Sequence, residues 1–158
     1  MKNILFLFLI GFFTLANGQA KKGTQKNTEA TAPQILRKPE VPILCYHRIR
    51  NILPGDGENM RTYSVTPANF AQQMKTLSDA GFHSISPSQL YEYLVHDGIL
   101  PQKPILLTFD DTREEHYRLA APEMTKYGFK GAFFIMTVSI NRPGYLTKVQ
   151  IKNLSDNG

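Results

Sequence analysis

The sequence PILLTFDDTREEHY, from Pro104 to Tyr117, joins an apolar run to two adjacent carboxylates. Ile105 to Phe109 is typical of a buried strand, because the run is short and continuously apolar. Asp110 and Asp111 follow it directly, and two like charges held close together raise one pKa unless a cation neutralises the pair. Two interpretations are open. The pair forms a polar turn that caps the following helix, or a bound cation holds the carboxylates together.

Strand-like and helix-like segments alternate along the rest of the chain. Proline after a capping residue predicts helix starts at Thr66-Pro67 and Ser86-Pro87, and Thr147 is predicted to cap a last helix. Strands are predicted at residues 41–49, 82–86, 104–109 and 130–140, with a helical region between the last two that Pro122 interrupts. Continuous apolar strands that alternate with helices predict an α/β fold with a parallel sheet, either open or closed into a barrel.

Both parallel architectures gather their ligands at the carboxyl ends of the strands. Asp110 and Asp111 lie at such an end, and His47 lies near the end of the strand that starts at Val41. A divalent metal bound by Asp111 would remove the repulsion and lower the pKa of its water towards ~7. Asp110 could then accept the proton of that water as a general base.

The N-terminal residues have the composition of an export signal followed by a linker. Lys2 precedes the apolar run ILFLFLIGFFTLA, and Ala16-Asn17-Gly18 has the small residues of a cleavage site. We therefore expect a signal peptide at 1–18, a flexible tether at 19–36 and a folded domain at 37–158. An uncleaved membrane anchor is the alternative, but the run is short for a span of roughly 20 residues. The protein is expected to be exported, periplasmic or extracellular, and to have no stable membrane span after cleavage.

The net charge of +5 is unevenly distributed. Residues 19–50 carry seven Lys or Arg against two acids, whereas residues 51–158 carry ten against eleven. The predicted domain is therefore close to neutral, which argues against a nucleic-acid-binding face. Cys45 is the single cysteine, so an internal disulfide is excluded, and its place in an apolar run predicts a small buried hydrophobic side chain.

Three segments in order resemble the polysaccharide deacetylases of carbohydrate esterase family 4, with their NodB-type homology domain. They are PILCYHRI at 42–49, ILLTFDDT at 105–112 and YGFKGAFFIMT at 127–137. The resemblance extends from Val41 to Gly158. It implies an irregular (β/α) barrel, of which this chain is the N-terminal portion.

The resemblance also implies a chemistry and its residues. Members of the family remove acetyl groups from sugar polymers, using a metal, usually zinc, to activate water, and they hold the oxyanion with the metal and a backbone N–H. Carried over to this chain, Asp110 becomes the catalytic base and Asp111 a metal ligand. His47 matches a histidine found in one branch of the family, and we expect it in the substrate pocket.

Two departures from the family pattern affect the expected site. Thr112 stands where the family often has glycine, so the loop is expected to have a different shape, and Thr112 is expected beside His47 in the substrate pocket. The family's His-x-x-x-His pair, which completes an Asp-His-His metal site, has no counterpart among the four histidines of the chain. NRPGY at 141–145 resembles a later family motif in composition, but its position predicts a turn.

The resemblance thus implies a metal-dependent hydrolase that acts on an acetylated N-acetylglucosamine polymer, and the missing histidine pair leads us to expect no activity from this chain alone. The alternative is a non-catalytic carbohydrate-binding or interaction protein that keeps the fold without the chemistry. A domain that binds Mg²⁺ and phosphate is a third possibility, but it would need a glycine-rich phosphate loop, which the sequence lacks.

Overall fold

The structure, a computed structural model, describes residues 29–157. The predicted signal peptide and residues 19–28 of the predicted tether lie outside the described residues. Within residues 29–36, Ala32–Ile35 forms the short helix α1, and the Ala30 N–H donates a hydrogen bond to the Val95 carbonyl at 2.9 Å. The chain is thus in contact with the folded domain before Arg37.

Parallel strands form the centre of the molecule. Strand β5 (Pro104–Phe109) pairs along one side with β1 (Ile43–Tyr46). Strand β5 also pairs with two short strands. β4 (His83–Ser84) pairs with the first two residues of β5, and β6 (Ala132–Phe133) pairs with its last two. A separate pair joins β2 (Arg48–Ile49) to β3 (Ser64–Val65), also in parallel. The predicted parallel α/β fold is confirmed.

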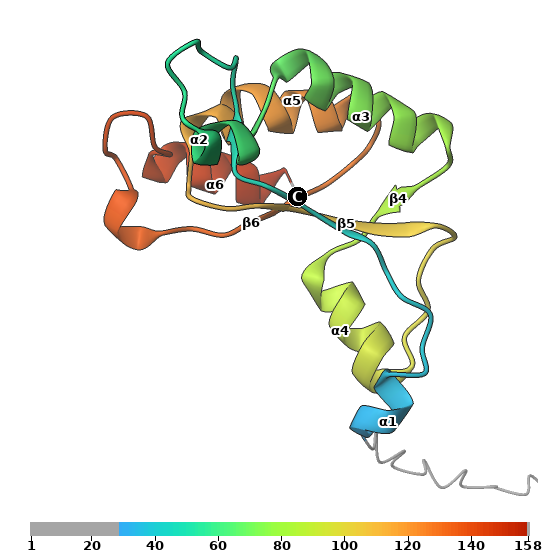
Figure 1. Cartoon of the computed structure of the whole chain (residues 1–158). Helices are drawn as coiled ribbons and strands as arrows, with labels where there is room; N and C mark the ends of the chain where they lie inside the picture. The colour runs from blue at the N-terminus through green and yellow to red at the C-terminus, as the bar shows by residue number, and fades with distance from the viewer. Residues whose placement is uncertain (1–28, 158) are drawn as a thin grey trace, which may run out of the picture.

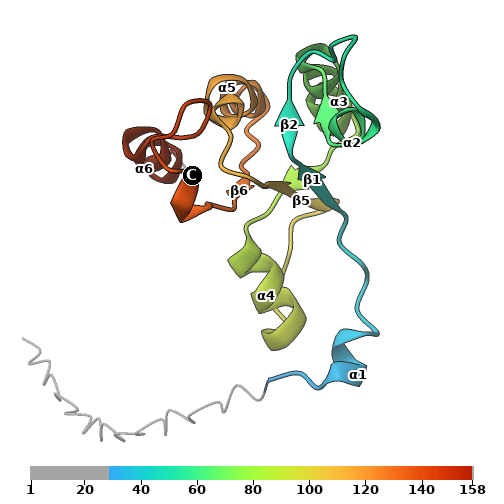
Figure 2. The same cartoon turned by 60° about the vertical axis from the view of Figure 1, so that its left-hand side comes forward.

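Helices cover the sheet on opposite sides. Figures 1 and 2 show α3 (Pro67–Asp79) and α5 (Ala121–Thr125) on one side and α4 (Pro87–His96) on the other. The other helical segments are α2 (Glu58–Thr62), the π-helical turn His116–Ala120, the 3₁₀ turn Thr137–Ser139 and α6 (Lys148–Asp156). None of the helices in residues 29–157 has the length and apolar character that a membrane crossing requires.

The predicted helix starts are confirmed by their capping bonds. The Thr66 hydroxyl accepts a hydrogen bond from the Asn69 N–H at 3.2 Å. Ser86 and Thr147 each form a capping box with a glutamine three residues later, Gln89 and Gln150. Each cap satisfies backbone N–H groups that the first helical turn leaves without partners, which is why these helices start where the sequence predicts.

Aromatic side chains on neighbouring strands and helices make the core. Phe109 stacks on Phe133 and Tyr46 with ring centroids 4.8 and 5.4 Å apart, and Phe70 of α3 meets Tyr46 edge to face. Gly131 allows this packing, because a Cβ at that position would lie 2.6 Å from the Phe109 ring. The core therefore lies directly beneath the carboxyl end of β5.

Two predicted strands are shorter than the sequence indicates. The run 41–49 divides at His47 into β1 and β2, which pair with different partners. The run 130–140 keeps only two residues in the strand, because β5 ends at Phe109, whose carbonyl accepts a last hydrogen bond from the Phe134 N–H at 2.8 Å.

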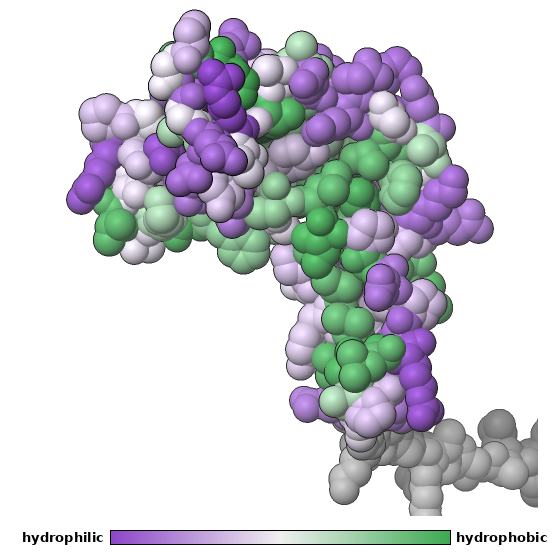
Figure 3. Space-filling model, viewed as in Figure 1, coloured by the Kyte–Doolittle hydropathy of each residue, from purple (hydrophilic) through white to green (hydrophobic). Residues whose placement is uncertain are grey.

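Cys45 was predicted to be buried, and this is wrong: its side chain is exposed. The reason is that β1 is an edge strand in the described part of the chain, with Ile43 and Leu44 also exposed. Figure 3, in the same view as Figure 1, shows apolar surface along the middle of the molecule.

Candidate active site at the strand ends

Asp110 and Asp111 occupy different surroundings because the backbone reverses between them. The Asp110 N–H donates to the Tyr46 carbonyl at 2.9 Å, which continues the β1–β5 pairing by one residue. Asp111 and Thr112 then adopt positive φ angles of 72° and 56°. Two consecutive left-handed residues turn the chain sharply, so the two carboxylates have different side-chain neighbours, although both border one hollow of the surface.

The Asp110 carboxylate belongs to a small polar cluster. Its Oδ2 atom lies 3.5 Å from Cys45 Sγ and 3.8 Å from His47 Nε2, and Cys45 Sγ lies 3.8 Å from His47 Nδ1. Desolvation raises the pKa of the Cys45 thiol, a hydrogen bond with Thr108 lowers it, and the Asp110 charge raises it again. Asp110 is half-buried, so the cluster is reached from solvent.

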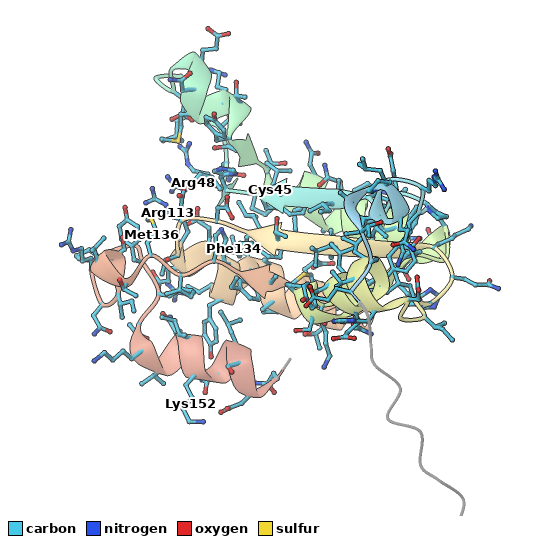
Figure 4. All side chains as sticks on the ribbon, turned by 90° about the horizontal axis from the view of Figure 1, so that it is seen from below. Cys45, Arg48, Arg113, Phe134, Met136 and Lys152 are labelled. Carbon is cyan, nitrogen blue, oxygen red and sulfur yellow. The ribbon has the colours of Figure 1, made fainter. Side chains whose placement is uncertain are left out.

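Asp111 faces two hollows of the surface. One, of about 510 Å³, is lined by Asp110, Asp111 and the segment Phe134–Met136. The other, of about 250 Å³, lies between Asp111, His47 and Tyr63 and is completed by Arg48, Asn59, Met60 and Arg113. Figure 4 shows Arg48, Arg113, Phe134 and Met136 around this end of the strands, whereas Lys152 lies apart on α6. Asp111 and His47, both predicted to lie at the site, therefore border the same hollow.

Thr112 was predicted to line the substrate pocket, and the structure shows that its side chain is buried. Its side chain is 1% exposed and lines neither hollow. Its hydroxyl accepts a hydrogen bond from the Met136 N–H at 2.5 Å, and its carbonyl accepts one from the Leu146 N–H at 2.9 Å. Thr112 is buried because it joins the turn after β5 to the segments that follow β6.

Thr112→Val is expected to destabilise the protein by about 0.5–1.5 kcal/mol, because the hydrogen bond from the Met136 N–H to the Thr112 hydroxyl is lost. Valine keeps the shape of the side chain and its branching at Cβ, so the comparison isolates the hydroxyl. Thr112→Ser keeps the hydroxyl and is the matched control. Urea unfolding of the two variants measures the difference, and equal midpoints would show that the hydroxyl bond contributes nothing.

His47 is held in place through its backbone. The His116 side chain, which is buried, lies with Nε2 2.8 Å from the His47 carbonyl, so Nε2 carries the proton and donates it. The His116 ring packs against Phe109, with centroids 5.4 Å apart. The His47 ring lies 4.9 Å from the Tyr63 ring. No local sequence pattern connects His116 with the site, because 69 residues separate it from His47.

Burial lowers the pKa of His116, although the His47 carbonyl opposes the shift. The unfolded chain then binds a proton more readily than the folded protein, so stability falls as the pH drops below the ordinary histidine value of about 6.5. We expect His116→Gln to have a smaller loss of stability between about pH 6.5 and 5 than the parent protein. His83→Gln, at an exposed histidine, is the control. Identical pH profiles for His116→Gln and the parent would contradict this account.

The segment NRPGY braces the turn that carries the carboxylates. Its residues form a turn, as predicted, and Tyr145 forms an isolated antiparallel bridge with Arg113. The Arg113 guanidinium lies over the Tyr145 ring, 4.5 Å from its centroid, and the Glu114 N–H donates to the Gly144 carbonyl at 3.1 Å. A turn signal was visible in the sequence, but its long-range partner was not.

Comparisons with known proteins agree with this arrangement. A family profile described as polysaccharide deacetylase matches residues 97–158. YxkH of Bacillus subtilis (strain 168), a protein named as a polysaccharide deacetylase, is 31% identical over 150 residues, which are 87% of this chain and 51% of YxkH.

Two solved structures share the fold. The deacetylase PplD of Streptococcus pyogenes, in complex with acetate, superposes with a TM-score of 0.66 at 30% identity, over 75% of this chain and 53% of PplD. IcaB of Ammonifex degensii superposes with a TM-score of 0.63 at 30% identity, over 75% of this chain and 49% of IcaB. The chain thus spans about half the length of the relatives that it matches. With the TFDD turn and the parallel strands, these matches make the chain similar to the polysaccharide deacetylases, by the family profile over residues 97–158 and by the relatives over about half of their length.

Proposed function

We propose that the protein carrying this chain is a metal-dependent deacetylase that removes acetyl groups from an N-acetylglucosamine polymer. The observation that carries the proposal is the turn at Asp110–Thr112, which gives two adjacent carboxylates at the carboxyl end of β5 different side-chain neighbours around a shared hollow. Similarity to the family supplies the reaction class, and the acetate bound to PplD is the expected product of such a reaction.

The residues of the chain fit one part of the family's metal site. Asp111 is half-buried beside two hollows, and within residues 29–157 no ion pair uses its carboxylate. A carboxylate with this freedom is a suitable oxygen ligand for Zn²⁺. Among the described residues, Asp111 offers one of the three ligands that the family pattern uses. We propose Zn²⁺ as the metal, which when bound provides Lewis-acid activation of water and of the acetyl carbonyl.

Asp110 is placed to act as the general base. In amide hydrolysis, water adds to the acetyl carbonyl carbon, the C–N bond breaks, and acetate and a free amine leave. Asp110 takes the proton from the attacking water. Its Oδ2 atom lies 3.8 Å from His47 Nε2 and 3.5 Å from Cys45 Sγ. In this proposal Asp111 would bind the metal and Asp110 would accept the proton. The positive charge of the metal would offset the repulsion between the two carboxylates.

The alternative function is carbohydrate binding without catalysis. Tyr63 is exposed beside His47, and Phe134 is exposed beside Asp110, so aromatic faces are available at the same surface. Incubation with acetylated chitooligosaccharides separates the two functions. Release of acetate with a rising amount of free amine supports the enzyme, whereas saturable binding without acetate supports the binding protein.

We also propose that the protein is exported to the cell envelope. The support is the sequence of residues 1–18, which has the charge and apolar pattern of a signal peptide. The mass of the mature protein tests this: cleavage after Gly18 is expected, and an intact N-terminus on the mature protein would contradict it.

A further inference from the structure

Cys45, His47 and Asp110 meet because of the register between two strands. Cys45 pairs with Thr108 across β1 and β5, and two residues further along lie His47 and Asp110. Side chains alternate along a strand, so residues two apart point to the same face. The thiol, the imidazole and the carboxylate therefore converge at one end of the sheet, and Figure 4 shows Cys45 at the end of β1 beside this rim.

The donor atoms lie close enough to approach one ion. Cys45 Sγ and Asp110 Oδ2 are 3.5 Å apart, and His47 lies 3.8 Å from the thiol through Nδ1 and 3.8 Å from the carboxylate through Nε2. One ligand atom from each residue can be chosen so that all three lie within 4.8 Å of one another. Zinc bonds of ~2.3 Å to sulfur and ~2.0 Å to nitrogen or oxygen put tetrahedral ligands roughly 3.3–3.6 Å apart. A small rotation of side chains would close the site.

We propose that Cys45, His47 and Asp110 form a second divalent-cation site, selective for thiophilic ions such as Zn²⁺ and Cd²⁺ and distinct from the Asp111 site. Thiolate and imidazole donors favour these ions over Mg²⁺ and Ca²⁺. Nearby cations do not oppose it, because Arg48 is paired with Glu115 at 2.6 Å and Arg113 lies over Tyr145. With three protein ligands, the fourth tetrahedral position is open to water.

The site has a consequence for catalysis, which rests on the proposed function. A cation on Asp110 Oδ2 uses the lone pairs with which Asp110 would accept a proton. Thiophilic ions in excess of the catalytic metal would therefore inhibit deacetylation, by blocking the base rather than by displacing the metal at Asp111.

Titration of the protein with Cd²⁺ and with Co²⁺ tests the site without any activity measurement. A thiolate-to-metal charge-transfer band is expected in the parent protein and absent in Cys45→Ser. His47→Gln and Asp110→Asn are each expected to weaken Cd²⁺ binding by at least about tenfold, since each removes a ligand. Asp111→Asn and His83→Gln are the controls, and both should keep the band and its affinity.

Two results would overturn the proposal. One is the absence of a charge-transfer band at saturating Cd²⁺, and the other is unchanged affinity in the His47→Gln, Asp110→Asn double variant, which would reduce the site to a lone thiol. Because Cys45 is exposed, Cys45→Ser should fold, and circular dichroism checks this. Inhibition is scored separately, as the ratio of acetate release with and without Cd²⁺. A Cd²⁺ band without inhibition would leave the cation site standing and count against Asp110 as the base.

Discussion

Asp110→Asn is expected to lower the rate of acetate release by about 10²–10⁴-fold, the range that a general base contributes. Asparagine has nearly the same shape as aspartate, but its amide cannot accept a proton from water at neutral pH. The strand end should be unchanged, because the Asp110 backbone N–H still donates to the Tyr46 carbonyl. Acetate release from an acetylated chitooligosaccharide by the full protein measures the effect.

Asp111→Asn is the matched comparison, since it removes the neighbouring carboxylate of the same turn. This variant is expected to lose the tightly bound metal, whereas Asp110→Asn keeps it. Measuring the metal content of each variant after dialysis distinguishes Asp111→Asn from Asp110→Asn. Equal metal retention in both variants, or turnover by Asp110→Asn at the parent rate, would contradict the division of tasks between the two carboxylates.

Phe109→Ala is expected to reduce the free energy of unfolding by about 3–5 kcal/mol. Phe109 is 0% exposed, and its ring contacts the rings of Tyr46, Phe70, Phe133 and His116. Alanine would leave a cavity that two short strands and a π-helical turn cannot collapse to fill. Because domains of this kind have about 5–15 kcal/mol in total, a large part of the stability would be lost.

Phe134→Ala is the control for this experiment, because the same residue type lies one position beyond β6 but is 57% exposed. Its effect on urea unfolding is expected to be within about 0.5 kcal/mol. Similar losses in both variants would show that the aromatic cluster beneath the site does not dominate the core.

The parts of the fold set by local signals could be predicted from the sequence. Capping residues followed by proline fix the starts of α3 and α4, and continuous apolar residues fix β5 from Pro104 to Phe109. The errors arose where pairing partners decide the outcome. Cys45 has the sequence context of a buried residue, but burial depends on which side of β1 is covered: Phe70 of α3 packs against Tyr46, whereas the Cys45 side chain is exposed.

The residues of the candidate site likewise include some that local sequence could predict and some that depend on distant partners. Asp110, Asp111 and His47 could be placed at the strand ends, because side chains at the carboxyl ends of parallel strands meet there. The buried role of Thr112 depends on Met136 and Leu146, and that of His116 depends on the His47 carbonyl. These partners lie more than twenty residues away in sequence, where no local pattern can indicate them.

Metal dependence is the most direct test of the proposed reaction. The protein is freed of metal with a chelator, and acetate release from an acetylated chitooligosaccharide is measured before and after Zn²⁺ is restored in stoichiometric amount. The proposed function predicts that activity disappears with the metal and returns with Zn²⁺ in the parent protein, but does not return in Asp111→Asn. Acetate release that continues at the original rate in metal-free protein would contradict it.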